Sequence, residues 1–325
     1  MPASQGSAGA GREARESAAE VVPARNRVSE IQRQRLLVGM AEVAAERGVG
    51  TVTVAHIVAR SGVSRRTFYE LFSDREDCLL AALDQALERA SAAVLPAYQG
   101  SERWRERMRA SLTALLAFFD EEPAMARLCV VESLGAGPQA LERRTAVVQR
   151  LIAAVDEGRG EAKARPGREA PPLTAEGAVG AVLAVLHARL VSAHRTPLSP
   201  LAPALMSMIV APYLGQASAE KELQRPAPQL KTKFRPRRDP LDGLDMRLTY
   251  RTVRVLIAIG SNPHASNRGV AAAAGIADQG QISKLLTRLQ NLGLIANVGE
   301  GQAKGAPNAW ALTPKGVEVE RSMRA

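Results

Sequence analysis

Cysteine, aromatic residues and long apolar runs are all scarce in this 325-residue sequence. Its two cysteines, Cys78 and Cys129, are too few for a disulfide framework and are typical of a reducing cytoplasm, where we expect the protein. No apolar run approaches the roughly 18 to 20 residues needed to span a bilayer, and the N-terminus lacks the apolar segment of a secretory signal. We therefore expect neither a secreted disulfide scaffold nor a membrane partner.

The sequence also lacks the motifs of metal, nucleotide and covalent chemistry. The four histidines and two cysteines show no metal-ligand spacing. Neither a phosphate-binding GxxxxGK[ST] loop nor a G-x-S-x-G nucleophile motif occurs. We predict no metal, no cofactor and no enzymatic activity.

Basic charge, in contrast, is plentiful and unevenly distributed. The net charge is +10, and residues 221–325 hold 17 Lys and Arg against 8 Asp and Glu. Such a balance favours an anionic partner, most often nucleic acid, although a solubilising surface has the same composition.

Composition and apolar spacing divide the chain into five segments. Residues 1–25 are rich in small and charged residues, which predicts a disordered arm. Apolar residues recur at helical spacing through 26–92 and 93–216, and a Pro/Arg/Lys/Asp-rich stretch, 217–246, is predicted to be a basic linker. Residues 247–325 predict helices followed by a short β-hairpin. The predicted fold class is mainly all-α, with a small α+β domain at the C-terminus.

The segment SGVSRRTFYELFSDREDCL, residues 61–79, gathers rings and arginines in an aromatic-poor chain. Thr53 is placed to cap one short helix, Gly62 supplies a turn, and Ser64 caps a second helix over 65–72. The second helix turns its phenylalanines inward and carries two arginines at its N-terminus. This helix–turn–helix spacing suits a recognition helix in the DNA major groove.

Residues of about 30–80 resemble the DNA-binding domain of the tetracycline-repressor (TetR) family of transcription regulators. The matching positions are Thr53, Gly62-Val63-Ser64, Thr67, Tyr69, Phe72 and Arg75-Glu76, while Ser73 and Arg75 replace a frequent proline and lysine. The resemblance implies DNA-backbone contacts by Thr53, Ser64, Thr67, Tyr69 and Arg75. Arg65 and Arg66 are the candidates for base-edge contacts.

The same resemblance implies that 93–216 is a helical effector-binding and dimerisation domain. The apolar runs 176–193 and 202–214 suit the helices of a dimer interface, and equally the buried core of a monomer. Candidates for lining a pocket for a small-molecule effector are Trp104, Met108, Phe118, Cys129 and His187.

A second helix–Gly turn–helix pattern occupies 266–295 and leads into the strand-like segments LIANV and AWALT. This pattern resembles a MarR-like winged helix. Its candidate DNA-binding residues are Gln279, Gln281, Ser283, Lys284, Arg288 and Lys304. Winged helices also mediate protein interactions, so both roles remain open for this domain.

Together these patterns predict a homodimeric, ligand-responsive transcription regulator that binds a double-stranded DNA operator in a sequence-specific way. The alternative is a regulatory scaffold whose winged helix binds protein. A weaker third interpretation is a helical protein that sequesters or modifies a ligand.

Overall fold

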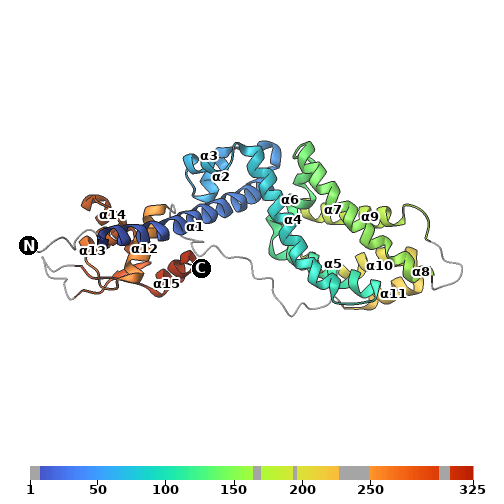
Figure 1. Ribbon diagram of the computed structural model, residues 1–325. Helices are drawn as coiled ribbons and strands as arrows, with labels where there is room; N and C mark the ends of the chain where they lie inside the picture. The colour runs from blue at the N-terminus through green and yellow to red at the C-terminus, as the bar shows by residue number, and fades with distance from the viewer. Residues whose placement is uncertain (1–7, 164–169, 193–195, 227–248, 300–307, 325) are drawn as a thin grey trace, which may run out of the picture. The chain divides into compact units, whose positions relative to one another are not determined.

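The computed structural model describes residues 8–163, 170–192, 196–226, 249–299 and 308–324, and they are mainly α-helical (Figure 1). This confirms the predicted fold class. The helices are α1 (Ala8–Arg47), α2 (Val54–Ser61), α3 (Arg65–Leu71), α4 (Arg75–Gln99), α5 (Trp104–Glu121), α6 (Pro123–Val130), α7 (Pro138–Asp156), α8 (Gly158–Lys163), α9 (Thr174–Val191), α10 (Ala202–Leu214), α11 (Gln216–Gln224), α12 (Tyr250–Ser261), α13 (Asn267–Ala273), α14 (Gln279–Asn291) and α15 (Pro314–Arg324). Three short 3-10 helices, η1 (Val49–Thr51), η2 (Glu132–Leu134) and η3 (Ser199–Leu201), and two strands, β1 (Ile295–Asn297) and β2 (Trp310–Leu312), complete the set.

Contacts divide the chain into two units that do not follow chain order. One unit comprises Met1–Arg35, Ser61–Leu71 and Arg238–Ala325, and the other comprises Leu36–Arg60 and Phe72–Arg237. The sequence-based domain limits therefore stay a prediction, and α4 runs continuously across the predicted limit at 92/93.

Helix α5 lies at the centre of the second unit. It contacts α4, α6, α8 and α10, and it buries side chains along most of its length. Trp104 at its first turn packs edge-on against Tyr213 of α10, with ring centroids 5.3 Å apart, and donates its indole N–H to the carbonyl of Ala154. The aromatic residues of this helix thus belong to the packed core.

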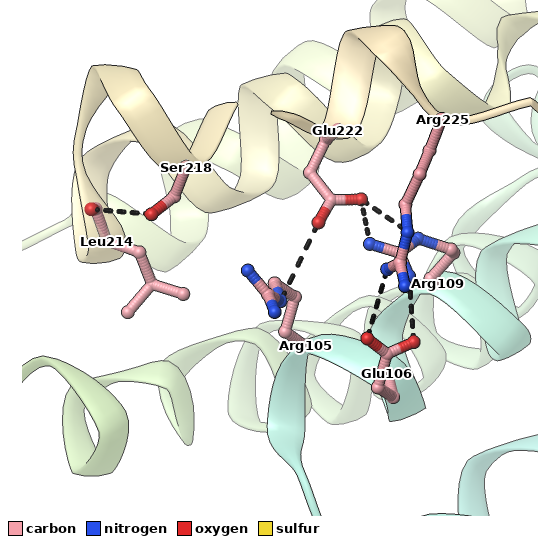
Figure 2. A network of polar contacts seen from close by, with 7 residues as sticks. All are labelled: Arg105, Glu106, Arg109, Leu214, Ser218, Glu222 and Arg225. Atoms are coloured by element: carbon pink, nitrogen blue, oxygen red, sulfur yellow. Dashed lines mark hydrogen bonds and ion pairs between the residues drawn. The ribbon is translucent and has the colours of Figure 1, made fainter. Parts of the chain in front are cut away.

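Helix α11 occupies part of the segment predicted to be a linker, so the prediction is wrong for residues 217–224. The helix buries Ser218, Ala219 and Glu222, which share one face at spacings of one, three and four residues. Glu222 is almost fully buried and is paired with Arg109 and Arg105 of α5, as Figure 2 shows. The polar composition of this segment suggested a tether. The partners of the Glu222 carboxylate lie more than 100 positions away, so no local pattern showed that it is buried.

The N-terminal arm was also predicted wrongly. Helix α1 begins at Ala8, so residues 8–25 are helical, whereas the disordered-arm prediction covered 1–25. Alanine, glutamate and arginine are strong helix formers, and their frequency here outweighs the lack of apolar periodicity.

The C-terminal part of the first unit has the order α12–α13–α14–β1–β2–α15. The two strands pair antiparallel, with Ile295 opposite Leu312 and Asn297 opposite Trp310. Helix α12 contacts α13, α15 and β2, so it forms the centre of a small core. This core also includes Val28 of α1, which is 4% exposed, with Ile31 packed against it.

Helix α9 differs from the expectation that no apolar run is long enough to span a bilayer. By length and composition alone it is long and apolar enough to cross a membrane, although core helices pass the same test. Only 22% of its residues are buried, which leaves much of this apolar helix exposed in the single chain.

Candidate nucleic-acid interface

The first candidate interface begins where α2 ends and α3 begins. Thr53 caps α2, because its hydroxyl oxygen accepts the backbone N–H of His56 at 3.3 Å. After α2 ends at Ser61, Gly62 takes a φ of +66°, a conformation that side chains with a Cβ rarely adopt. The turn therefore depends on this glycine, as its position in the sequence predicted.

Ser64 caps α3. Its Oγ accepts the backbone N–H of Thr67 at 3.1 Å and lies 2.9 Å from the Thr67 hydroxyl. Both side chains are half-buried. The two candidate phosphate contacts are thus held together by one capping arrangement, which orients the first turn of α3.

The exposed surface of α3 carries the candidate base readers. Arg65 and Arg66 are both exposed, and the Arg66 side chain, 89% exposed, donates from Nε to Glu70 at 2.9 Å. Tyr69 is 57% exposed and packs edge-on against Phe68, which is completely buried. One side of α3 anchors the helix, while the other presents two guanidinium groups and a phenol to the surroundings.

Arg75 lies in a different environment from that of Arg65 and Arg66. Its side chain is half-buried, and Nη1 donates to the backbone carbonyl of Val49 at 2.9 Å. Asp74 caps the same end of α4 by accepting the Asp77 N–H at 2.9 Å. Arg75 therefore ties the start of α4 to η1.

Arg60, at the end of α2, is also engaged with the protein itself. It donates to Glu46 at 2.5 Å and to Glu42 at 3.2 Å, both on α1. The hydrogen bond to Glu46, followed by that to Glu42, raises the pKa of Arg60 above its usual value. This cation stabilises the contact of α2 with α1.

The second candidate interface is the exposed face of α14. Its candidate residues are Gln279, Gln281, Ser283, Lys284 and Arg288, all of which are exposed, whereas Lys304 lies outside the described residues. Asp278 caps the helix by accepting the N–H groups of Gly280 at 2.8 Å and Gln281 at 3.1 Å. The bond from Gln281 and then that from Gly280 lower the pKa of this carboxyl.

Two arginines of α12, Arg251 and Arg254, were missed by the sequence reasoning. Arg251 is exposed and donates from Nη1 to Oε1 of Gln281 at 3.0 Å. Arg254 lies over the ring of Tyr250, 5.6 Å from its centroid, beside Gly275 in the turn before α14. No local signal marked these residues, because Arg251 and its partner are 30 positions apart.

The candidate effector-pocket residues are spread over three helices. Trp104, Met108 and Phe118 belong to α5, while Cys129 lies on α6 and His187 on α9. All are buried except His187, which is half-buried. Trp104 and Phe118 are fourteen residues apart on one helix, or roughly 20 Å. They therefore do not line the same end of a compact pocket.

An open depression of about 450 Å³ lies instead at the C-terminal end of α9. Its lining residues are Val185, Ala188, Arg189, Ser192 and Thr196, none of which is among the candidates. In the part of the chain that the structure describes, no group of His, Cys, Asp and Glu side chains is arranged to hold a metal ion.

The N-terminal region is similar to known bacterial regulatory proteins. Residues 36–82 match the sequence model of bacterial regulatory proteins of the tetR family. The HTH-type transcriptional activator FasR of Mycolicibacterium smegmatis is 28% identical over 108 residues, which are 33% of this chain and 49% of that protein. The match thus spans about half the length of this curated relative.

A solved structure supports the fold of a larger part of the chain. The fatty acid degradation regulator FadR of Bacillus halodurans aligns with a TM-score of 0.50 and 16% identity, over 57% of this chain and 97% of that one. At this identity the likeness concerns the fold alone. Residues 36–82 are therefore similar to the helix-turn-helix region of tetR-family regulators, and the helical fold of a larger part of the chain is similar to that of FadR.

Proposed function

We propose that this protein is a sequence-specific, DNA-binding transcription regulator that responds to a small molecule. The observation that carries the proposal is the family match at residues 36–82, within which Arg65 and Arg66 stand exposed at the start of α3. The relatives are described as transcription regulators, which gives no support to an enzymatic or scaffold role.

In this proposal Arg65 and Arg66 read base edges in the major groove. A bidentate arginine–guanine pair contributes about 1–3 kcal/mol of discrimination. Arg66 has to release Glu70 to do so, an exchange that costs little because the ion pair is exposed. Thr53, Ser64, Thr67 and Tyr69 contact the DNA backbone. Arg75 contacts it too, through guanidinium N–H groups other than the one bound to Val49.

A homodimer places two such recognition helices on a palindromic operator. Support comes from the exposed side of α9, where small residues recur at helical spacing: Gly177, Gly180, Ala184 and Ala188. These residues permit close approach of a second helix, and an exposed apolar helix gains stability when a partner covers it. Helix α10, which contacts α9, is the second candidate for this interface.

The C-terminal part, residues 247–325, is proposed to be a winged helix that adds a second DNA contact. Its support is the order of helices and paired strands and the exposed polar face of α14 with Arg251 beside it. The small-molecule effector is proposed to bind within the helical unit.

The direct test is selection of bound fragments from genomic DNA, followed by affinity measurements on the recovered operator. Arg65→Ala with Arg66→Ala should abolish the preference for operator over random DNA, while leaving the non-specific affinity within about tenfold. The matched control is Arg144→Ala with Arg150→Ala on α7, which removes the same charge. Retained specificity in the α3 variant contradicts the assignment of the base readers.

A second measurement separates the two roles of the C-terminal part. Removal of residues 241–325 should shorten the footprint on the operator and reduce the salt dependence of binding, since log K changes by about 0.9 per neutralised phosphate for each unit of log salt. An unchanged footprint with a changed oligomeric state would instead favour the scaffold interpretation.

A further inference from the structure

Glu132 in η2 is a buried carboxylate with both oxygens engaged. It is 7% exposed. Its Oε2 accepts the backbone N–H of Val49 at 2.8 Å, across 83 positions of sequence, and its Oε1 accepts Nε of Arg127 at 3.2 Å. A buried carboxylate requires such partners, because an unpaired charge is strongly disfavoured away from water.

These two bonds belong to a longer chain of contacts. Arg127 of α6 donates from Nη1 to the carbonyl of Leu190 at 2.8 Å, and Leu190 lies in the last turn of α9. At the other end, the carbonyl of Val49 accepts Nη1 of Arg75 at 2.9 Å. The contacts therefore run without interruption from α9 through α6, η2 and η1 to the first residue of α4, all within one unit.

The backbone around η1 is shaped for this contact. Gly48, with a φ of +79°, brings η1 toward the carboxylate, and a Cβ on it would lie 3.9 Å from Oε2 of Glu132. On the opposite side, a Cβ on Gly135 would lie 3.8 Å from a methyl group of Val49, which is itself buried. The η1 turn is thus held by a hydrogen bond and by packing against the end of η2.

On α9, the chain of contacts ends at a backbone carbonyl in the last turn of the helix. The carbonyl of Leu190 is one of the last four of α9, which have no partner within the helix. The open depression lined by Val185, Ala188 and Arg189 borders this same end of α9. Because Arg127 bonds to the Leu190 carbonyl, a displacement of the end of α9 changes that bond.

We propose that Glu132 is a positioning residue, through which α6 and the end of α9 set the conformation of η1 and of the start of α4. The inference rests on the proposed function, because η1 connects α1 to α2 in the DNA-binding domain and Arg75 opens the helix that follows α3. Its sensitive element is the Arg127–Glu132–Val49 series. A static brace between η2 and η1 would need only the last of these contacts.

In the proposed relay, the bond between Arg127 and Glu132 affects Val49; in a static brace, only the bond between Glu132 and Val49 does. Amide hydrogen exchange of the full-length chain distinguishes the two without requiring DNA. Glu132→Gln keeps an acceptor but loses one of the two links, and should speed exchange of the Val49 amide at least tenfold. Arg127→Gln does not touch Val49, yet the relay predicts at least threefold faster exchange there. Exchange at Val49 within twofold of wild type in Arg127→Gln overturns the proposal.

Two controls accompany this measurement. Arg89→Gln breaks a comparable, partly buried ion pair with Glu122, between α4 and the start of α6, and should leave Val49 unchanged. Protection of α5 reports whether a variant has lost its fold. If Arg127→Gln proves unfolded, Arg127→Lys keeps the charge but not both bonds, and the same threefold criterion applies.

The second arm measures affinity for the recovered operator fragment. Arg127→Gln and Glu132→Gln should each weaken binding at least threefold, because a loosened η1 has to be ordered when DNA binds. The double variant should be no weaker than the poorer single variant, since both changes break one series. The relay is overturned if the losses of affinity in the two single variants multiply in the double variant. It is also overturned if either single variant binds DNA as tightly as the wild type or more tightly. If the wild-type protein binds no DNA, the proposed function fails while the exchange experiment still decides the relay.

Discussion

Arg109 and Glu222 form a buried ion pair between α5 and α11, 113 positions apart in the sequence. Nε of Arg109 donates to Oε2 of Glu222 at 2.9 Å, and Nη2 donates to the same oxygen. Glu106 binds the remaining Nη1 of Arg109 at 2.7 Å and also binds Arg225 at 3.1 Å (Figure 2). The network fixes α11 immediately before the segment that leads to the C-terminal part.

Removing the central carboxylate should destabilise this unit strongly. Glu222→Ala leaves the guanidinium groups of Arg105 and Arg109 without it, and breaking a buried pair costs about 3–5 kcal/mol. Denaturant unfolding should therefore show a loss of about 3 kcal/mol. Glu220→Ala, at an exposed position of the same helix, is the control and should change the free energy of unfolding by less than about 0.5 kcal/mol. A loss for Glu222→Ala as small as that for Glu220→Ala would mean that the network contributes no stability.

The α3 cap allows its stability role to be separated from DNA contact. Ser64→Ala removes the acceptor of the Thr67 N–H and should cost about 1 kcal/mol of stability. Ser64→Asp restores the acceptor and should recover most of that loss. If Ser64 also faces phosphate, the aspartate should weaken operator binding more than alanine does, most clearly at low salt. DNA affinities that simply follow the unfolding free energies would remove Ser64 from the interface.

Local signals in the sequence were sufficient for the helix–turn–helix. A glycine with positive φ and a capping hydroxyl act on residues only three or four positions away. The roles of Gly62 and Ser64 can therefore be predicted from their neighbours in the sequence. The roles of Glu222 and Glu132 depend on partners 113 and 83 positions away, which no local pattern reveals. For the same reason the sequence placed Glu222, a buried carboxylate of α11, in a predicted linker.

The contribution of α1 to the C-terminal core was equally hidden, and it leads to a third prediction. Val28→Asp places an unpaired carboxylate among the buried residues of α12 and should destabilise that core by more than about 2 kcal/mol. Hydrogen exchange should accelerate in α12 and α15, with α5 unaffected. Val38→Asp, on the same helix at a side chain that is 39% exposed, is the matched control. Unchanged protection of α12 in Val28→Asp would show that α1 is dispensable for this core.

Gly316 in α15 is required by a close backbone approach. A Cβ at this position would lie 1.9 Å from the carbonyl oxygen of Leu294, so Gly316→Ala forces the helix away from the strand β1. We expect a loss of about 1–3 kcal/mol, typical of overpacking, measured by thermal unfolding of the full chain. In Gly269→Ala the new methyl group meets its nearest neighbour at 3.5 Å and lies in helix α13, so this control should be neutral or slightly stabilising.

Burial of Cys129 predicts an unreactive thiol with a definite pH dependence. Desolvation raises its pKa from 9.0 to about 12, because the thiolate is disfavoured in the apolar interior. The folded state therefore favours the protonated thiol, and the resulting stabilisation is complete below pH 9 and is lost as the pH rises toward 12. In a Cys78→Ala background, alkylation of the native protein should stay slow up to pH 10 and become fast only in denaturant. Rapid alkylation that titrates near pH 8.5 in the native state would place Cys129 in an accessible site and support its assignment to a ligand pocket.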